Sequence, residues 1–440
     1  MTKSTDKPSR QSRDMRRSYG NMAYRWYALA VMTLLLACNA LDRAIPNLLV
    51  EPIRHEFGLN DTQLSLVTGL AYALSYSLAV LPMGYISDRG NRRNLLAVCV
   101  ILWSAFTALG GFARTYVQLL IARFCVGATE SGAMPTMLPM ISDIFPSANR
   151  GRAFGVLFTH SALGSLLSGI VGGYLAHEYG WRAAFLAAGL PGVLLALLLM
   201  ATVKEPKRGE MEASEDLDDG APPTWKEAAL FLVKSPGLIC LIGGSALFGM
   251  TTVTVWAWIG SFFIRVHHLS LKEVGGVIGI ATGLGPLIGP LLMGWLGDMA
   301  GKRDVRLPLV MMAGAALIAM LCGMVMLFTA SVGVAIVMLF LHEIFKTFAP
   351  ICFAATMNNT PARLRGSVMA IDQLVIQFVS FGLGPLLAGI LSDLYGGATS
   401  IRYAVANVLG VLIVVAILFL AAARLLYGPD PAQAHGKGAA

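Results

Sequence analysis

The feature that most constrains this chain is a series of apolar runs, each long enough to cross a membrane. A spanning helix needs about 20 mostly apolar residues. Twelve windows meet that length: residues 26–50, 62–86, 94–112, 116–142, 152–177, 181–203, 236–264, 272–298, 307–329, 332–357, 365–392 and 400–426. The runs are continuous and do not alternate with polar residues, which excludes an outer-membrane barrel. We therefore expect an all-α membrane protein with twelve transmembrane helices.

The composition agrees with that class. Charged residues make up 13% of the chain, about half of their usual share in a soluble domain. The formal net charge of +8 comes from basic residues in short connections beside the apolar runs, so membrane topology explains it better than nucleic-acid binding does. Most of these bases lie in the N-terminal tail and in the even-numbered connections. The positive-inside rule then places both termini in the cytoplasm, in a cell (inner) membrane.

Two motifs repeat between the halves of the chain. A Gly-x-x-x-Asp motif starts at Gly84 and again at Gly294, and 294 − 84 = 210. A Pro-(x)₃-Arg-Gly motif starts at Pro146, and a related one at Pro361, and 361 − 146 = 215. Two motifs at nearly one offset indicate parallel repeats of six helices each. We expect two pseudo-symmetric six-helix bundles.

The bundles and the polar segments divide the chain into five parts. They are a disordered cytoplasmic tail (1–25), an N-terminal bundle (26–203), a cytoplasmic linker (204–235), a C-terminal bundle (236–427) and a second tail (428–440). The acidic, proline-containing linker cannot bury enough apolar surface to fold alone. Residues 225–234 have apolar residues at helical spacing, which predicts a short interfacial helix.

Charged residues inside the first apolar run are the main indication of function. Asp42 and Arg43 lie where a charge costs at least about 2.5–3.5 kcal/mol on insertion scales. Asn39, Arg43 and Asn47 step by four and share one helix face. We expect this face to line a transport path, with Asp42 as a carboxylate that exchanges a proton and Arg43 as an anion anchor. The alternative is an ion pair that only locks helices together.

The fourth run carries Arg123 and Glu130, seven residues apart on one face. Glu130 is expected to pair with Arg43 or to titrate beside it; the alternative is a permanent structural partner of Arg123 or Arg43. Further candidates along the transport path lie on later helices, and each could instead be a packing residue. They are His160, Trp256, Glu343, Lys346, Asp372 and Gln377. Arg265, His267 and His268 are expected to be surface groups at the external mouth.

Other functional classes find no support in the sequence. It contains no nucleotide-binding P-loop, catalytic triad or metal-ligand cluster, and none of the six cysteines has disulfide or metal spacing. We expect no enzyme activity and no cofactor other than a coupling proton.

The segment Gly84-Tyr-Ile-Ser-Asp-Arg-Gly-Asn-Arg-Arg93 resembles the signature loop of the major facilitator superfamily. The resemblance implies two six-helix bundles that work by alternating access. It also implies a set of cytoplasmic gating residues that form charge locks, in which Asp88 and Arg89 join Arg150, with Asp298 and Arg365 as their equivalents in the second half, and that bias the conformational equilibrium. In this chain they would be Asp88, Arg89, Arg93, Asp143, Arg150, Asp298 and Arg365.

A narrower resemblance covers the first half. Asp42-Arg43, the segment from Glu51 to Leu59, and Gly180-Trp-Arg-Ala-Ala-Phe185 are similar to the spinster family of lysolipid and sphingolipid transporters. This implies a proton-coupled secondary transporter of an amphipathic lipid, in contact with membrane lipids and working as a monomer. One alternative is a proton-coupled symporter of small organic anions, a group whose fourth helix also carries an Arg and then a Glu. A lipid scramblase or membrane sensor is the alternative from a different class.

Overall fold

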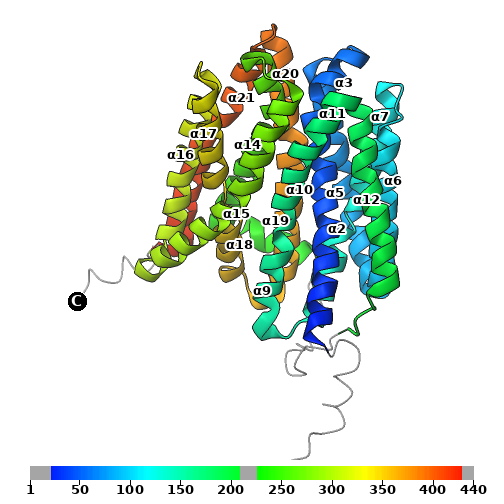
Figure 1. Ribbon diagram of the computed structural model, residues 1–440. Coiled ribbons are helices and arrows are strands. Elements are labelled where there is room, and N and C mark those ends of the chain that lie inside the picture. Colours follow the sequence, from blue (N-terminus) through cyan, green and yellow to red (C-terminus); the bar gives the residue numbers. More distant parts are fainter. Residues whose placement is uncertain (1–20, 209–224, 429–440) are drawn as a thin grey trace, which may run out of the picture.

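A computed structural model describes residues 21–208 and 225–428, and every regular element in those two ranges is a helix (Figure 1). The predicted tails therefore fall mostly outside the described residues, as does the acidic part of the linker, residues 209–224. The described start of the chain and its described end lie at the same end of the molecule. We name this the basic end, after the arginine-rich connections there. We name the opposite end, which carries helix α3, the latch end, after the ion pairs that join the two bundles there.

The first group of helices, the N-terminal bundle, is built from six spans. Its elements are α2 (Met22–Leu48), α3 (Val50–Phe57), α4 (Asp61–Ser65), η1 (Leu66–Leu70), α5 (Ala71–Arg89), α6 (Arg92–Gly110), α7 (Tyr116–Glu130), α8 (Ala133–Ile144), α9 (Ser147–Phe158), α10 (His160–Leu167), η2 (Ser168–Gly172), α11 (Gly173–Tyr179) and α12 (Trp181–Thr202). The helix α13 (Trp225–Val233) lies in the second part of the predicted linker, where a short helix was predicted.

The second group, the C-terminal bundle, repeats this arrangement. Its elements are α14 (Pro236–His267), α15 (Leu271–Arg303), α16 (Leu307–Phe328), α17 (Val332–Phe345), α18 (Ala349–Asn358), η3 (Ala362–Leu364), α19 (Arg365–Gln377), η4 (Phe378–Leu383), α20 (Gly384–Tyr395), α21 (Ser400–Gly410) and α22 (Leu412–Tyr427). The two groups stand side by side, and α10 of the first group lies next to α15 of the second in Figure 1.

Eleven of the twelve predicted spans are helices long and apolar enough to cross a membrane, within the described ranges. The predicted span 116–142 is present but broken into α7 and α8 by a turn at Ser131 and Gly132. Pro135 explains the break, because it has no N–H to donate to the carbonyl of Ser131 one turn earlier. The twelve-helix fold is confirmed, with this interruption in the fourth span.

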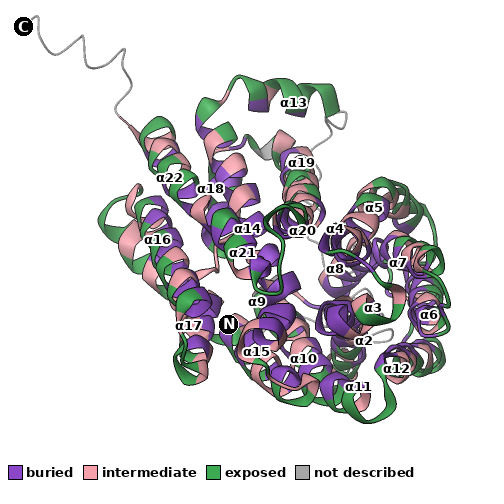
Figure 2. Cartoon of the chain, turned by 90° about the horizontal axis from the view of Figure 1, so that it is seen from above, coloured by how far each residue is buried: buried purple, intermediate pink, exposed green. Residues whose placement is uncertain are grey.

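Burial follows the membrane assignment. In the most apolar 18-residue window of α2 and of α14, 72% of residues are buried inside the protein, against 22–44% for the other nine spans. These two helices therefore lie at the centre. Figure 2 shows the exposed residues on the outward faces of the helices. Large apolar side chains such as Leu78, Leu194 and Leu291 are exposed there, as expected for helices that face lipid.

The two bundles approach each other closely where facing helices carry glycine. A Cβ atom on Gly275 of α15 would lie 2.3 Å from the carbonyl oxygen of Gly169 and 2.9 Å from the Cα of Gly173. A residue larger than glycine would not fit without separating the helices. The turns η1, η2 and η4 are π-helical, and such turns are frequent at functional sites.

Helix α3 is fixed to its own bundle at the latch end. Glu56 accepts hydrogen bonds from Nη1 of Arg182 and from the indole nitrogen of Trp181, both at 2.6 Å. These hydrogen bonds, from Arg182 first and then Trp181, hold the pKa of the Glu56 carboxyl below its usual range. The short helix is thereby tied to α12.

Candidate functional site

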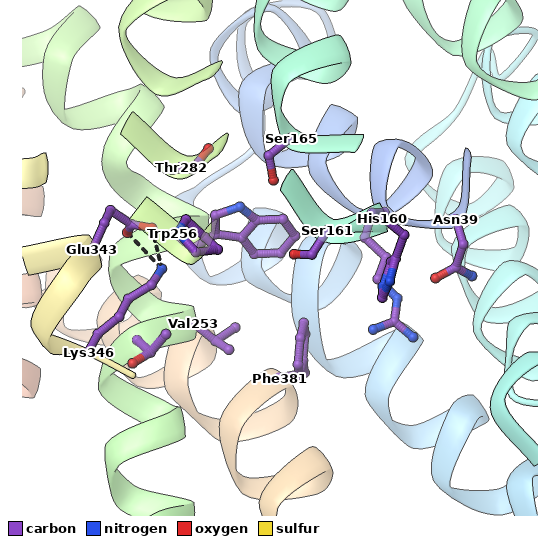
Figure 3. Close-up of a pocket in the computed structure, with 14 residues that line it drawn as sticks. Asn39, His160, Ser161, Ser165, Val253, Trp256, Thr282, Glu343, Lys346 and Phe381 are labelled. Atoms are coloured by element: carbon purple, nitrogen blue, oxygen red, sulfur yellow. Dashed lines mark hydrogen bonds and ion pairs between the residues drawn. The ribbon is translucent and has the colours of Figure 1, made fainter. Parts of the chain in front are cut away.

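A cavity between the two bundles is the candidate site (Figure 3). It holds about 700 Å³ of empty space, part of it open to solvent. Its lining comes from both halves of the chain, and nine of the fourteen lining residues are polar or charged. The lining residues are Asn39, Ala40, Arg43, His160, Ser161, Ser165, Thr252, Val253, Trp256, Thr282, Pro286, Glu343, Lys346 and Phe381.

Arg43 forms the charged part of the wall on the N-terminal side. Its Nε donates to Oε2 of Glu130 at 3.0 Å, and the side chain of Glu130 is fully buried while that of Arg43 is 23% exposed. The hydroxyl of Tyr72 donates to the same carboxylate oxygen at 2.7 Å. The pairing of Arg43 with Glu130 is the one that the sequence predicted. The cation therefore faces the cavity and the carboxylate faces the protein.

Aromatic rings surround the Arg43 guanidinium. Its central carbon lies 4.9 Å from the ring centre of Tyr72, 5.4 Å from that of Tyr76 and 5.7 Å from that of Phe381. Each such contact contributes about 0.5–2 kcal/mol. Because Phe381 belongs to the C-terminal bundle, this guanidinium contacts both halves of the protein.

Asp42 and Arg123 lie behind this wall and not in it. Both side chains are buried, and neither residue lines the cavity. Nη1 of Arg123 donates to the backbone carbonyl of Asp42 at 3.3 Å. Neither carboxylate oxygen of Asp42 has a hydrogen-bond partner among the described residues. Asn47, on the same helix, lines a separate small hollow beside α15.

The wall on the C-terminal side has its own charged pair. Nζ of Lys346 lies 2.7 Å from one carboxylate oxygen of Glu343 and 2.6 Å from the other. Glu343 is again the buried member, with 1% of its side chain exposed against 13% for Lys346. A Cβ atom on Gly285 of α15 would lie 2.4 Å from the Cβ of Glu343. Glycine at this position therefore lets α15 pack directly against the aliphatic part of the Glu343 side chain.

The two buried glutamates occupy equivalent positions in the repeat. The offset between them, 343 − 130 = 213, lies between the offsets 210 and 215 of the repeated motifs. The helix breaks beside them are also equivalent. Pro350 lies 350 − 135 = 215 residues after Pro135. It follows the break at residues 346–348, as Pro135 follows the break at Ser131 and Gly132. Each half thus ends a helix in mid-span at a buried glutamate or just after it.

Trp256 and Phe381 lie between the two walls in Figure 3. Their rings meet edge to face, with centres 6.3 Å apart. His160 lines the N-terminal wall, and its Nδ1 lies 2.8 Å from the carbonyl oxygen of Leu157 in the preceding turn. The structure therefore brings together Asn39, Arg43, His160, Trp256, Glu343 and Lys346 at one cavity.

Two other predicted residues lie apart from that cavity. Asp372, on α19, is 1% exposed and does not line it. Gln377, at the end of the same helix, does not line it either. Their place in a transport path stays a prediction.

The predicted gating residues at the basic end do not form charge pairs between the bundles. Asp88 is exposed, and Arg89 stacks on Tyr85 within its own helix. Arg150 donates to the carbonyl groups of Phe145 and Ser142. In the second half, Arg365 likewise donates to carbonyl groups, those of Met357 and Thr360.

The remaining gating candidates have partners other than those expected. Nη1 of Arg92, which the sequence did not single out, donates to Asp143 at 2.8 Å. The backbone N–H of Arg93 donates to Glu205. Asp298 lines a separate hollow inside the C-terminal bundle. The expected network between Asp88, Arg150 and their counterparts is therefore not formed in this conformation.

Arg265 is not the surface group that the sequence predicted. It is 8% exposed, and its Nη1 and Nη2 each donate to an oxygen of Asp61 at 2.7 Å, while its Nε donates to Glu51 at 2.7 Å. Ser392 adds a hydrogen bond to Asp61 at 2.6 Å. Arg265 can be buried because two carboxylates from the opposite bundle satisfy its guanidinium. We call Arg265, Glu51, Asp61 and Ser392 the latch.

Hydrogen bonds from the start of α4 extend the latch. Asp393 of α20 accepts from the backbone N–H groups of Asp61 and Thr62, at 2.9 and 2.8 Å, and from the Thr62 hydroxyl. In the described ranges, the ion pairs between the two bundles are those of Arg265 with Glu51 and Asp61. The bundles are therefore fastened at the latch end.

Sequence reasoning missed several residues of the site. Tyr72 and Tyr76 are four apart and share a helix face, a polar pair in an apolar span that could have been recognised. Phe381 had no such signal, because its role depends on the contact between bundles. Among the described residues, no group of three potential ligands could hold a metal ion.

The sequence of this chain is similar to those of known transporters. The sequence profile of the Major Facilitator Superfamily matches residues 32–381 and 281–440. An "MFS-type efflux pump" of Mycolicibacterium smegmatis is 30% identical over 281 residues, which are 64% of this chain and 64% of that protein's length. A "probable galactarate/D-glucarate transporter" of Bacillus subtilis is 26% identical over 374 residues, covering 78% of this chain and 80% of the relative.

The fold is also that of a solved transporter structure. A bacterial homologue of the human lysosomal transporter spinster, in an inward-facing and unoccupied conformation, superposes with a TM-score of 0.82 at 23% identity. The alignment covers 94% of this chain and all of the other. The fold and the relatives are those of transporters, which confirms the prediction that the chain is not an enzyme.

Proposed function

The chain belongs to the major facilitator superfamily, and from this premise we propose that it is a secondary transporter that carries small organic anions together with protons. The observation that carries the proposal is a polar cavity with a cation on each side, Arg43 and Lys346. A guanidinium binds a carboxylate with two parallel hydrogen bonds, and an ammonium group adds a point charge. Such a cavity favours an anionic solute.

The polar lining favours a small solute over a lysolipid. Ser161, Ser165, Thr282 and Asn39 present hydroxyl or amide groups beside the charges. An acyl chain packed against these groups would remove their water without replacing its hydrogen bonds, which is costly. A hydroxylated acid can replace those bonds. Sequence resemblance favoured the lipid; the cavity supports the organic-anion alternative.

The relatives support the same solute class. The Bacillus subtilis relative, which aligns over most of both chains, is named for galactarate and D-glucarate. Both compounds are hydroxylated organic acids. The spinster-like fold supports lipid transport as the second candidate, because that structure covers 94% of this chain.

Exchange of partners at Arg43 couples the substrate to a proton. While Glu130 is ionised, it holds the guanidinium in an ion pair. A substrate carboxylate that takes its place would leave Glu130 as a buried unpaired charge, which is strongly unfavourable. Protonation of Glu130 removes that charge. Binding of the anion and uptake of a proton therefore favour each other.

The orientation of the protein in the membrane is also part of the proposal. The connections at the basic end carry Arg89, Arg92 and Arg93, with Lys302 and Arg303 in the second half. The positive-inside rule places this end in the cytoplasm and the latch at the external face of a cell membrane. The structure then represents a state closed to the outside.

Uptake into liposomes that contain the purified full-length chain tests the function. With the outside acidic, we expect accumulation of labelled D-glucarate or D-gluconate and none of lysophosphatidylethanolamine. Dissipating the pH gradient should prevent accumulation. Movement of the lysolipid without either sugar acid would overturn the proposal in favour of lipid transport. Lipid exchange that is independent of the gradient would indicate a scramblase.

A further inference from the structure

We propose that the cavity is built for a dianion, with Arg43 binding one acidic group and Lys346 binding the other. This inference rests on the proposed function and adds the substrate class. Figure 3 shows Lys346 and Glu343 on one side of the cavity and Asn39 and His160 on the other. A solute in the cavity thus lies between two basic side chains from different bundles.

The two charged pairs are arranged in the same way. In each, the carboxylate is buried in its own bundle and the cation is the more exposed member: 23% against 0% for Arg43 and Glu130, and 13% against 1% for Lys346 and Glu343. Both glutamates are also equivalent in the internal repeat, 213 residues apart. The second pair therefore repeats the first as an anion-binding arm.

The origin of the cation differs between the halves. The position 213 residues after Arg43 is Trp256, so the C-terminal bundle has no basic residue at the equivalent position. Lys346 stands on the same helical span as Glu343, three residues later, and supplies the charge from there. This lysine occupies the end of α17 next to a mid-membrane helix break. A structural ion pair would not need to face the cavity, but Lys346 does.

A dianion satisfies both arms at once. A monoanion on Arg43 leaves Lys346 paired with Glu343, so it gains nothing from the second cation. A second carboxylate at the far end of the solute can replace Glu343 on Lys346, provided that Glu343 takes up a proton and is not left as a buried unpaired charge. Hydroxyl groups of Ser161, Ser165 and Thr282 line the cavity beside these arms, and they suit a hydroxylated chain between the two acid groups.

The test compares D-glucarate with D-gluconate, which share a hydroxylated six-carbon chain and differ in the second terminal carboxylate. The full-length protein in liposomes should transport D-glucarate with a kcat/KM about tenfold higher, equivalent to about 1.4 kcal/mol. Replacing Lys346 alone would leave Glu343 buried without its partner. The main variant is therefore the double substitution Glu343→Gln with Lys346→Gln, which removes both charges.

In the double variant the ratio of the two kcat/KM values should fall to about one, since about 1.4 kcal/mol of selectivity is lost. Lys272→Gln, on an exposed lysine at the latch end, should keep the wild-type ratio. A general structural defect would slow both substrates and leave their ratio unchanged. An unchanged ratio in the double variant, or a wild-type ratio near one, would overturn the dianion site while leaving anion transport intact. Absence of uptake of either sugar acid by the wild-type protein would overturn both proposals.

Discussion

At the scale of single residues, the two adjacent charges of the first span have different surroundings. Arg43 faces the cavity and is held by Glu130, whereas Asp42 is fully buried behind it. A helix turns about 100° per residue, so neighbours in sequence cannot share a face. Arg43 is therefore the residue placed to bind substrate, and Glu130 is the carboxylate that responds to it.

Glu130→Gln should abolish the effect of the pH gradient, because the amide cannot exchange a proton. We expect gradient-driven accumulation of D-glucarate in liposomes to fall at least about tenfold. Glu178→Gln, at an exposed glutamate on α11, is the matched control and should behave as wild type. If the yield of folded protein falls as much as the uptake does, Glu130 is a structural partner only.

Arg43→Lys tests the geometry of the anion anchor. Lysine keeps the charge but lacks the planar fork that binds a carboxylate with two hydrogen bonds. It also weakens the cation–π contacts that the guanidinium makes with Tyr72 and Tyr76. The KM for D-glucarate should rise about tenfold or more, equivalent to at least about 1.4 kcal/mol. Arg114→Lys at the exposed latch end should leave KM unchanged; equal KM values for both variants would contradict the assignment.

At the scale of elements, helices α10 to α11 and α15 form a seam between the bundles. The seam depends on glycine, since a Cβ on Gly275 would overlap the backbone of Gly169. Alternating access requires such a seam to close and reopen. A Cβ atom on the next residue, Gly276, would meet no neighbouring atom within 4 Å, so this glycine offers a matched control on the same helix.

Gly275→Val should prevent the seam from closing and hold the latch end open. Spin labels are attached to cysteines introduced at exposed positions 178 and 272, on either side of the seam, in a protein whose native cysteines have been replaced. The distance between the two labels should increase. Gly276→Val should give the wild-type distance. Transport should be lost in the first variant and kept in the second. An unchanged distance in Gly275→Val would show that the bundles do not meet there in solution.

Most of the elements could be predicted from the sequence, because hydrophobic length and turn residues are local signals. The twelve spans and the two-bundle repeat followed from them. The break after Glu130 did not, although Pro135 marks it, because a proline in a membrane helix is also compatible with a kinked but continuous helix. The cavity itself was predicted only in part: Arg43, Glu343 and Lys346 stood out as charges in apolar spans, whereas Phe381 did not.

At the scale of the whole molecule, the latch fastens the two bundles to each other at one end. The sequence predicts a surface group at Arg265 because its partners, Glu51 and Asp61, lie about 200 residues earlier in the chain. Contacts between bundles of this kind cannot be read from a local pattern. In this conformation the latch is formed and the predicted charge network at the basic end is not.

Arg265→Gln should shift the protein toward a state open at the latch end. Loss of the guanidinium leaves the two buried carboxylates with only Arg54, at 4.0 Å from Glu51 and 3.8 Å from Asp61, at a cost to the closed state of up to about 3–5 kcal/mol. The distance between labels at positions 178 and 272 should increase. Arg182→Gln removes an ion pair at the same end that lies within one bundle, and it should not change the distance. The opposite pattern would show that the latch does not control closure.

The central claim is that an organic anion and a proton cross together, and proton movement measures this most directly. Liposomes containing the full-length chain and a pH-sensitive dye are prepared with equal pH on both sides. We predict that external D-glucarate acidifies the interior, whereas the uncharged polyol D-sorbitol does not. An interior pH that stays constant while labelled D-glucarate enters would contradict the account.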